Sequence, residues 1–220
     1  MARLIAEPLA KGLGQPLVVE NRGGADNILG AMAVAKAPAD AYTLMFGTGA
    51  VFAINPHTSK SMPYDPLKDF APVTPVVSYV NVMVVNPNVP AKTVAEFVAW
   101  AKADPSRASF ASGGNGATNH LSGELLKALT GVPMVHVPYK GSAPATADLV
   151  AGHLQAMMGT LPAALPFAKS GRVKALAISS AKRWPSVPEY PTVAESGVPG
   201  YEVILWTGVL APAGTPKEII

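Results

Sequence analysis

The chain has 220 residues and a formal net charge of +3, with 49% hydrophobic and only 14% charged residues. This length can bury a substantial core, as one large domain or two small ones. The cationic residues form no stripe that would follow a phosphate backbone and the chain has no cysteine, so we expect neither nucleic acid binding nor disulfide, thiolate or cysteine-rich zinc chemistry.

Apolar runs suited to strands alternate with helical patterns along the chain. The expected strands are Leu17–Glu20, Tyr42–Phe46, Val80–Val85, Ser109–Ala111, Met134–Val137, Gln155–Met158 and Val173–Ile178. The expected helices are Ala2–Lys11, Ile28–Lys36, Thr93–Ala103, His120–Leu129, Ala143–Ala151 and Ala163–Lys169. This alternation favours an α/β fold with a mostly parallel sheet and helices on both faces.

Short polar signals predict where some of these helices begin. Thr93 followed by Glu96 indicates a capping box, and Thr118 or Asn119 would cap the helix that starts near His120. Near the end of the chain, Thr215 followed by Pro216 predicts the first turn of a further helix. The first helix begins at the initial methionine with no cap, so we expect both ends to lie inside a fold.

Two long uncharged stretches, Phe70–Ala91 and Leu149–Ala168, raise the question of a membrane span. A spanning helix needs about 20 predominantly apolar residues. Both stretches contain several prolines, which would break such a helix, so we expect buried strands and short helices instead. The first residues also lack the apolar core of a secretory signal peptide, so we expect no export signal in this chain.

The strongest functional signal is the glycine-rich segment Phe110–Glu124, which has the pattern of a strand end, a loop and a helix start. Gly113, Gly114 and Gly116 let the backbone turn sharply and approach a ligand closely. Free N–H groups and the positive dipole end at a helix start favour an anion. The pattern predicts either a small-anion site or a tight turn without a ligand, and it matches neither a nucleotide P-loop nor a dinucleotide-binding fingerprint.

A catalytic interpretation is the alternative. Ser112, His120 and an aspartate could form a nucleophile triad, which would make the chain a serine-type hydrolase or esterase on an α/β scaffold. No G-x-S-x-G elbow occurs, and His120 suits packing or capping better than the role of a base. The four histidines lack metal-type spacing, so we expect no metal site and no cofactor.

Ten short motifs occur in an order that resembles one family of binding proteins. They are Val18–Arg22, Asp40–Leu44, Ala53–Pro56, Pro63–Pro66, Asp69–Pro72, Ser112–His120, Val137–Pro144, Pro191–Glu195, Pro199–Tyr201 and Leu210–Pro216. Together they closely resemble the Bug family, the extracytoplasmic substrate-binding receptors of tripartite tricarboxylate transporters. The resemblance covers essentially the whole chain.

The resemblance implies a two-lobed periplasmic-binding-protein fold of the Venus-flytrap type, with mixed, mostly parallel sheets flanked by helices. Residues 1–82 and 204–220 would form lobe 1 and residues 83–203 lobe 2, with crossovers near Val80–Val85 and Glu202–Gly208. The implied function is capture of a small carboxylate, either a di- or tricarboxylate or an aromatic acid, in a cleft between the lobes. The implied partners are the transporter's membrane subunits, the location is the periplasm, and the protein would be a monomer and not an enzyme.

The resemblance also implies site residues. Ser112–Thr118 corresponds to the family's second carboxylate-binding loop, in which N–H groups near Gly113 and Gly116, and the hydroxyls of Ser112 and Thr118, would hold a ligand carboxylate. The other implied ligand-binding residues are Asn115 in the same loop, Thr48 at a strand end in the other lobe, Tyr139 and Thr160. Lys140 is either a counter-charge or a solvated lysine.

Two departures from the family pattern matter. Family members begin with an export signal, a first strand and a first binding loop, and continue with helices after Pro216, so the resemblance implies a truncated chain with an incomplete first lobe. Many members carry an acidic residue where Gly159 and Thr160 stand here. Its absence would suit a second carboxylate or a neutral group on the ligand.

Overall fold

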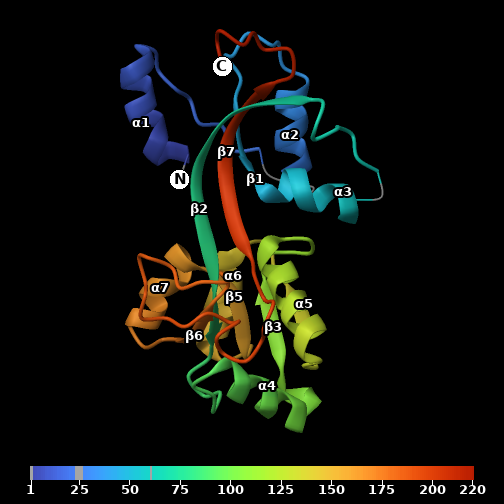
Figure 1. Cartoon of the computed structure of the whole chain (residues 1–220), viewed down its shortest axis with the longest axis vertical. Coiled ribbons are helices and arrows are strands. Elements are labelled where there is room, and N and C mark those ends of the chain that lie inside the picture. Colours follow the sequence, from blue (N-terminus) through green and yellow to red (C-terminus); the bar gives the residue numbers. More distant parts are fainter. Residues whose placement is uncertain (1, 23–26, 60) are drawn as a thin grey trace. The chain divides into compact units, whose positions relative to one another are not determined.

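A computed structural model describes residues 2–22, 27–59 and 61–220 of the chain (Figure 1). The chain divides into two compact units, Met1–Val77 with Trp206–Ile220 (unit 1) and Ser78–Leu205 (unit 2). The chain passes between the units inside two strands, β2 (Phe70–Val85) and β7 (Ile204–Pro212). The lobe boundaries 82/83 and 203/204 stay a prediction.

Unit 1 is built around the short antiparallel pair of β1 and β7. Its other elements are α1 (Ala2–Leu13), α2 (Ile28–Ala35), β1 (Met45–Thr48), the π-helix η2 (Ala50–Ile54) and α3 (Asn55–Thr58). Strand β1 pairs antiparallel with β7, from Met45 opposite Leu210 to Thr48 opposite Thr207, and β7 in turn neighbours β2. The core of this unit consists of Ala31, Val34, Met45, Val51, Tyr64, Phe70 and Leu210.

Unit 2 contains a mixed sheet in the order β6–β2–β5–β3–β4. The strands other than β2 are β3 (Ser109–Ser112), β4 (Val135–Pro138), β5 (Ala156–Thr160) and β6 (Lys174–Ile178). The helices are α4 (Val94–Ala103), the 3-10 helix η3 (Pro105–Arg107), α5 (Thr118–Thr130), α6 (Ser142–Ala151) and α7 (Leu161–Lys169). Strand β3 is parallel to β4 and β5, while β2 runs antiparallel to β5 and β6.

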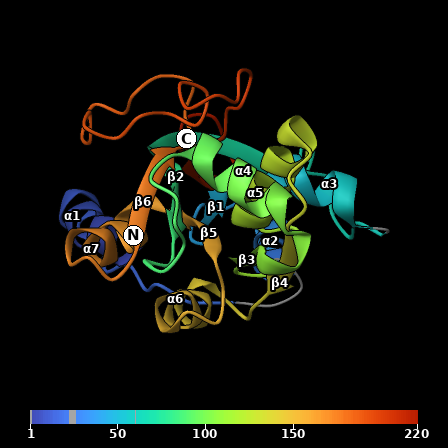
Figure 2. The same ribbon diagram turned by 90° about the horizontal axis from the view of Figure 1, so that it is seen from below.

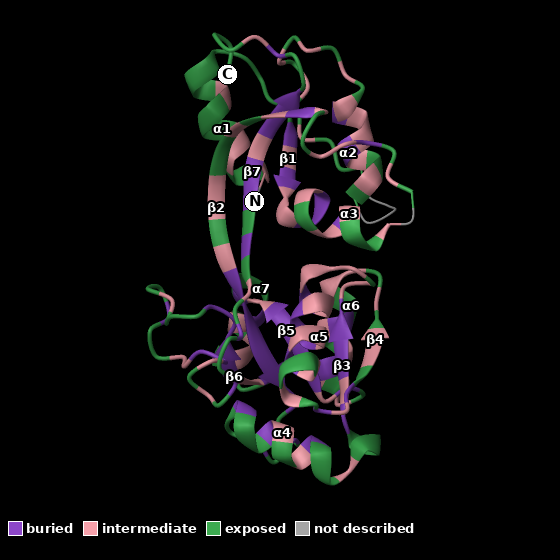
Figure 3. Cartoon of the chain, turned by 45° about the vertical axis from the view of Figure 1, so that its right-hand side comes forward, coloured by how far each residue is buried: buried purple, intermediate pink, exposed green. Residues whose placement is uncertain are grey.

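Helices cover both faces of this sheet, as the sequence predicted (Figure 2). Alternate residues of β2 face opposite sides: Met83 and Val85 pack with the residues of α4 and α5, whereas Val82 and Val84 pack with those of α6 and α7. The half of β2 that lies in unit 2 is therefore buried on both faces, which explains its continuous apolar run (Figure 3). In the half that lies in unit 1, only Phe70 is buried, and the residues from Ala71 to Val77 are half-buried or exposed.

The strand predictions were right in the interior of unit 2 and poorer in unit 1. Leu17–Glu20 is not a strand: it pairs with no other segment in the part of the chain that the structure describes, and Val18 is 91% exposed. The expected strand Tyr42–Phe46 begins only at Met45, since Tyr42 is itself 91% exposed. Neither β7 nor the first half of β2 was predicted as a strand.

Three predictions of helix ends can be compared with the structure. The Thr93 cap is confirmed, because its hydroxyl accepts the Glu96 N–H at 3.1 Å, although the Glu96 carboxylate takes the N–H of Lys92 rather than that of Thr93. The cap at Thr118 or Asn119 was wrong: α5 already begins at Thr118, and Ala117 occupies the cap position. The Thr215 cap was wrong, because its hydroxyl donates back to the Pro212 carbonyl, but the residues after it do form a turn, in which the Ile220 N–H donates to the Pro216 carbonyl at 3.2 Å.

The two uncharged stretches form the elements expected of a folded interior. Phe70–Ala91 is mostly β2, and Leu149–Ala168 holds the end of α6, then β5, then most of α7. Among the described residues, no helix has the length and apolar character needed to cross a membrane.

Candidate functional site

The parallel strands of unit 2 end at one edge of the sheet. Ser112, the last residue of β3, lies opposite Pro138, the last residue of β4, and β5 runs parallel beside β3 to end at Thr160. Each of these strands leads through a loop, or directly, into a helix: β3 into α5, β4 into α6 and β5 into α7. In open α/β sheets, ligands bind beyond the carboxyl ends of the strands.

None of the helices that begin at this edge has a side-chain cap, a feature that they share with α2 and α3 of unit 1. The cap positions of α5, α6 and α7 are Ala117, Gly141 and Thr160, and no side chain at these positions hydrogen-bonds to the first turn of its helix. None of the three helices has an acidic residue in its first turn. Helix α4, which does not begin at this edge, has both a Thr93 cap and Glu96 in its first turn.

Helix starts of this kind leave backbone N–H groups to be satisfied by water or a ligand, and they carry the positive end of the helix dipole. Three such helix starts lie at one sheet edge, and no carboxylate in their first turns compensates the partial positive charge of the helix dipoles. The edge of unit 2 is therefore chemically suited to an anion.

The glycine loop between β3 and α5 needs its glycines. Gly114 and Gly116 have φ angles of +143° and +74°, which strain residues with a Cβ. A Cβ on Gly113 would lie 3.3 Å from Ser142 Oγ, so the first turn of α6 packs closely against this loop. The loop is also tied to the neighbouring one, since the Gly141 N–H donates to the Gly113 carbonyl at 3.0 Å.

Several groups predicted to contact a ligand hold this loop together. The Ser112 side chain is fully buried, with its Oγ 3.0 Å from the Gly114 carbonyl oxygen and 2.6 Å from His136 Nε2. The Gly113 N–H donates to Asn119 Oδ1 at 3.3 Å, and the Gly116 N–H donates to His120 Nδ1 at 3.1 Å. In this arrangement these groups set the shape of the loop.

The other predicted residues of unit 2 lie around the same edge. Asn115 is exposed in the glycine loop, Thr118 opens α5, and Thr160 stands at the cap position of α7. Tyr139 follows β4, and its hydroxyl donates to Asp148 Oδ2 at 2.6 Å, which raises the pKa of the phenol and lowers the pKa of the Asp148 carboxyl. Lys140 is exposed.

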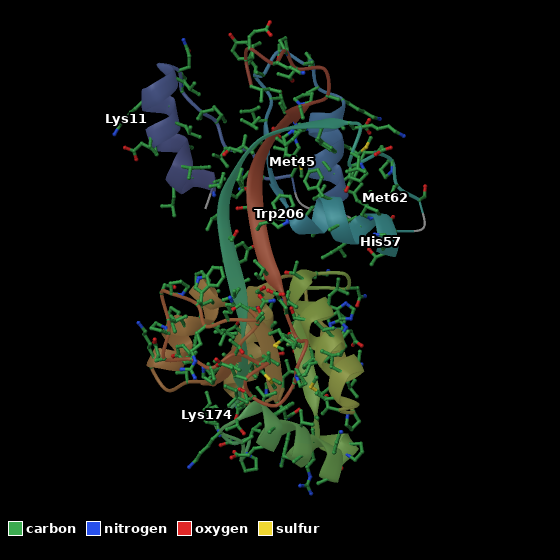
Figure 4. The ribbon with its side chains drawn as sticks, viewed as in Figure 1. Lys11, Met45, His57, Met62, Lys174 and Trp206 are labelled. Carbon is green, nitrogen blue, oxygen red and sulfur yellow. The ribbon has the colours of Figure 1, made fainter. Side chains whose placement is uncertain are left out.

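Thr48 is the one predicted residue that lies in unit 1. It ends β1 opposite Thr207, and Gly49 follows it. A Cβ on Gly49 would lie 3.0 Å from Nε1 of Trp206, the β7 residue labelled in Figure 4, and the Trp206 ring stacks on Phe52 with centroids 5.9 Å apart. Thr48 therefore lies next in the chain to a glycine that packs against the Trp206 ring.

Sequence reasoning missed the part played by His136. The ring of His136 stacks on that of His120, with centroids 3.8 Å apart and an angle of 19° between the planes. The parallel register that places His136 opposite Phe110, and the burial of Ser112 beside it, depend on strand pairing. The only sequence signal was a histidine in the otherwise apolar predicted strand Met134–Val137.

Ser112 pairs with His136, whereas the triad hypothesis had placed it with His120. The carboxylate nearest His120 is that of Glu124, with Oε1 3.8 Å from His120 Nε2. Within the described residues, no group of three or more His, Asp or Glu side chains could hold a metal ion.

The fold and the anion-suited sheet edge define the class: this is the fold of the two-lobed periplasmic binding proteins. Residues 1–220 match the model of the Tripartite tricarboxylate transporter family receptor (TctC), and the chain belongs to this family. The family resemblance noted from the sequence motifs is thereby confirmed, and so is the two-lobed α/β fold class. The sheets are mixed rather than mostly parallel, because β1–β7, β2–β5 and β2–β6 are antiparallel pairs.

The relatives agree with this assignment. Protein BugT of Bordetella pertussis is 40% identical over 221 residues, covering 100% of this chain and 68% of BugT. A solved structure of R. palustris Rpa4515 with adipate has 43% identity and a TM-score of 0.93, and the match covers 99% of this chain and 73% of that one. MatC from Rhodopseudomonas palustris with bound malate has 35% identity and a TM-score of 0.85, covering 99% and 74%. The chain spans about two thirds of the length of the curated relatives that it matches.

Proposed function

We propose that this chain is part of an extracytoplasmic solute-binding receptor that captures a small carboxylate for a tripartite tricarboxylate transporter. One observation carries the proposal: three helices begin at the carboxyl ends of parallel strands in unit 2 without a side-chain cap and without an acidic first turn. A ligand carboxylate would accept hydrogen bonds from such N–H groups and be favoured by the helix dipoles.

The composition of the edge fits a carboxylate better than a phosphate-rich ligand. The side chains expected to assist are hydroxyls and amides rather than clustered cations: Asn115, Thr118 and Thr160. Backbone and hydroxyl donors bind a singly charged carboxylate well, partly through water. Two relatives of the same family, described above, have adipate and malate bound, and both are dicarboxylates.

The roles of the individual residues belong to the proposal. Ser112, Gly113 and Gly116 would shape the loop, and contact the ligand if their present partners move. Asn115, Thr118 and Thr160 would contact it directly, while Tyr139 and Thr48 stay predictions from the family resemblance. The ligand would be a dicarboxylate, a tricarboxylate or an aromatic acid.

The cellular setting is also proposed from the family. The receptor would act in the periplasm as a monomer and deliver its ligand to the membrane subunits of the transporter. It would have no catalytic activity, no cofactor and no affinity for nucleic acid.

A thermal-shift screen tests the proposal. Adipate, malate, citrate and benzoate would be compared with 1,6-hexanediol, which has the carbon chain of adipate but no carboxylate. A ligand at about 100 times its dissociation constant stabilises by about 2.7 kcal/mol, which corresponds to roughly 5 to 10 °C for a chain of this size. We expect a shift with one or more acids and none with the diol.

The hydrolase alternative has its own readout in the same protein. An enzyme would release 4-nitrophenol from 4-nitrophenyl acetate continuously, at a rate proportional to protein concentration, whereas a receptor would not. Absence of a thermal shift with every acid, together with sustained ester turnover, would replace the receptor proposal with the hydrolase.

A further inference from the structure

Two histidines hold the two ends of the glycine loop. His136, on β4, has Nε2 2.6 Å from Ser112 Oγ, where the loop leaves β3. His120, in the first turn of α5, accepts the Gly116 N–H with Nδ1 at 3.1 Å, near the other end of the loop. The two rings stack on each other with centroids 3.8 Å apart, so the two histidines are in direct contact.

The bond from Gly116 defines the protonation state of His120. A backbone N–H only donates, so Nδ1 must carry a lone pair, and the proton of the neutral ring then lies on Nε2. That nitrogen faces Glu124 Oε1 at 3.8 Å. A second proton, on Nδ1, would place two N–H groups against each other and break the bond that anchors Gly116.

The surroundings favour the neutral form of both rings. The His120 side chain is only 19% exposed, and burial lowers its pKa below the ordinary value of 6.5. The pKa of His136 is lowered first by burial and then by the charge that His120 would carry. Phe110, on β3, lies beside both rings, with its centroid 4.9 Å from that of His136.

The charged groups that act on the pair both lie on α5. Glu124 raises the pKa values of the two rings, and Lys127 lowers them. Glu124 also forms an ion pair with Lys127 at 2.9 Å, which weakens its effect on the histidines. On β3, the residues in contact with the pair, Phe110 and Ser112, are uncharged.

We propose that His120 is a positioning residue that fixes the Gly116 end of the Ser112–Gly116 loop only while its imidazole is neutral, so that the shape of the anion site depends on pH. The ligand part of this inference rests on the proposed function. The anchoring of the loop does not, because it is a property of the ligand-free protein.

The direction of the pH dependence follows from the lowered pKa values. Above the ordinary value of 6.5 the rings are neutral in both the folded and the unfolded chain, and the anchoring is complete. As pH falls from there through the lower folded pKa, the unfolded chain binds protons more readily, so stability decreases. The loop is released over the same pH interval.

Substitutions at His120 distinguish the hydrogen bond that anchors Gly116 from the packing of the side chain alone. Asn places an amide oxygen where Nδ1 lies and does not titrate, whereas Leu has a similar size but no acceptor. The primary readout is the protection of the Gly116 amide against hydrogen exchange, measured by NMR without ligand from about pH 7.5 down to the lowest pH at which the protein stays folded. The exposed His153, substituted by Asn, serves as the control.

We expect the protection of Gly116 to fall about tenfold on acidification in the unmodified chain and in His153→Asn. It should be independent of pH in His120→Asn and low at every pH in His120→Leu. Unchanged protection of Gly116 in the unmodified chain, or equal behaviour of the Asn and Leu variants, would overturn the proposal.

Adipate binding at about pH 7.5, where the rings are neutral, provides the second readout. We expect a dissociation constant several-fold higher for His120→Leu than for His120→Asn. If adipate and the other acids bind none of the proteins, the carboxylate function fails, while the exchange data still decide whether His120 anchors the loop. Equal affinity of the two variants would overturn the link between anchoring and the site.

Discussion

At the residue scale, Gly123 shows how a missing side chain sets the distance between a helix and the sheet. A Cβ at this position of α5 would lie 2.2 Å from Cε2 of Phe110 on β3. The helix that begins at the glycine loop therefore lies as close to the sheet as Phe110 permits. The same phenylalanine ring lies beside the two histidines.

We predict that Gly123→Ala destabilises the protein. A methyl group here must displace Phe110 or the helix, and such overpacking costs roughly 1 to 3 kcal/mol. Urea unfolding measures the change. Gly12→Ala is the matched control, because Gly12 is also helical but a Cβ there meets nothing within 4 Å. There, alanine should be neutral or stabilising by about 0.5 to 1 kcal/mol; equal effects at the two positions would contradict the packing argument.

A second residue, Asn81, links the first turn of α5 to the rest of unit 2. It is fully buried on β2, and its amide donates to Ser122 Oγ at 2.8 Å. Ser122 in turn donates to the Thr118 carbonyl at 2.8 Å, and its own carbonyl accepts the Tyr201 hydroxyl at 3.0 Å. Burial raises the pKa of Tyr201, which keeps this hydroxyl protonated. Buried polar groups that are bonded in this way hold the start of α5 in one position.

At the scale of elements, the start of α5 has no side-chain cap and no acidic residue in its first turn. An aspartate at the cap position of α5 would occupy the N–H groups that we assign to the ligand. Ala117 has φ and ψ angles of −64° and 151°, an extended conformation suitable for a capping residue.

We therefore predict opposite effects of Ala117→Asp on stability and binding. The ligand-free protein should become more stable by about 0.5 to 2 kcal/mol in urea unfolding, because a cap is gained. Adipate affinity measured by calorimetry should fall about tenfold or more, since the new carboxylate competes with the ligand and repels it.

The control for this experiment adds the same charge elsewhere. Asn88→Asp changes an exposed residue that follows β2, at the sheet edge where β5 begins, since Val85 pairs with Ala156. It should leave adipate affinity nearly unchanged. A loss of affinity with both variants would show that total charge matters rather than the helix start.

At the scale of the whole molecule, the units differ in how the chain builds them. Unit 2 is one continuous segment, Ser78–Leu205, and it contains the hydrophobic clusters on both faces of its sheet. Unit 1 needs two segments, because β1 pairs with β7 and Leu210 completes the core around Met45. Unit 2 therefore holds all the contacts that its own folding requires.

We predict that residues 78–205, produced alone, fold cooperatively. Near-ultraviolet circular dichroism and a single urea transition measure this. Residues 1–77 are the control and should not fold, because they lack the partner strand of β1 and part of the core. A segment 78–205 without a cooperative transition would show that its stability depends on unit 1.

Most strands and helices of unit 2, and the place of the candidate site, could be predicted from local sequence patterns. Strands such as Ser109–Ala111 and helices such as Thr93–Ala103 were predicted within a few residues, because apolar periodicity and local caps carry that information. The ordered motifs pointed to the family, which the match over residues 1–220 confirmed. The glycine loop was recognised as a possible anion site because glycine spacing is a local signal.

The contacts that hold this loop, and the strands that complete the sheets, could be seen only in the folded structure. The prolines of Phe70–Ala91 argued against a membrane-spanning helix, and Pro72 and Pro75 are exposed in the long strand β2, since a strand tolerates proline where no ladder bond is needed. Leu17–Glu20 looked like a strand but has no partner among the described residues. His136 meets Ser112, and three helix starts meet at one edge, because strand pairing joins residues far apart in the chain. Such pairing is non-local, so it leaves no pattern in a short stretch of sequence.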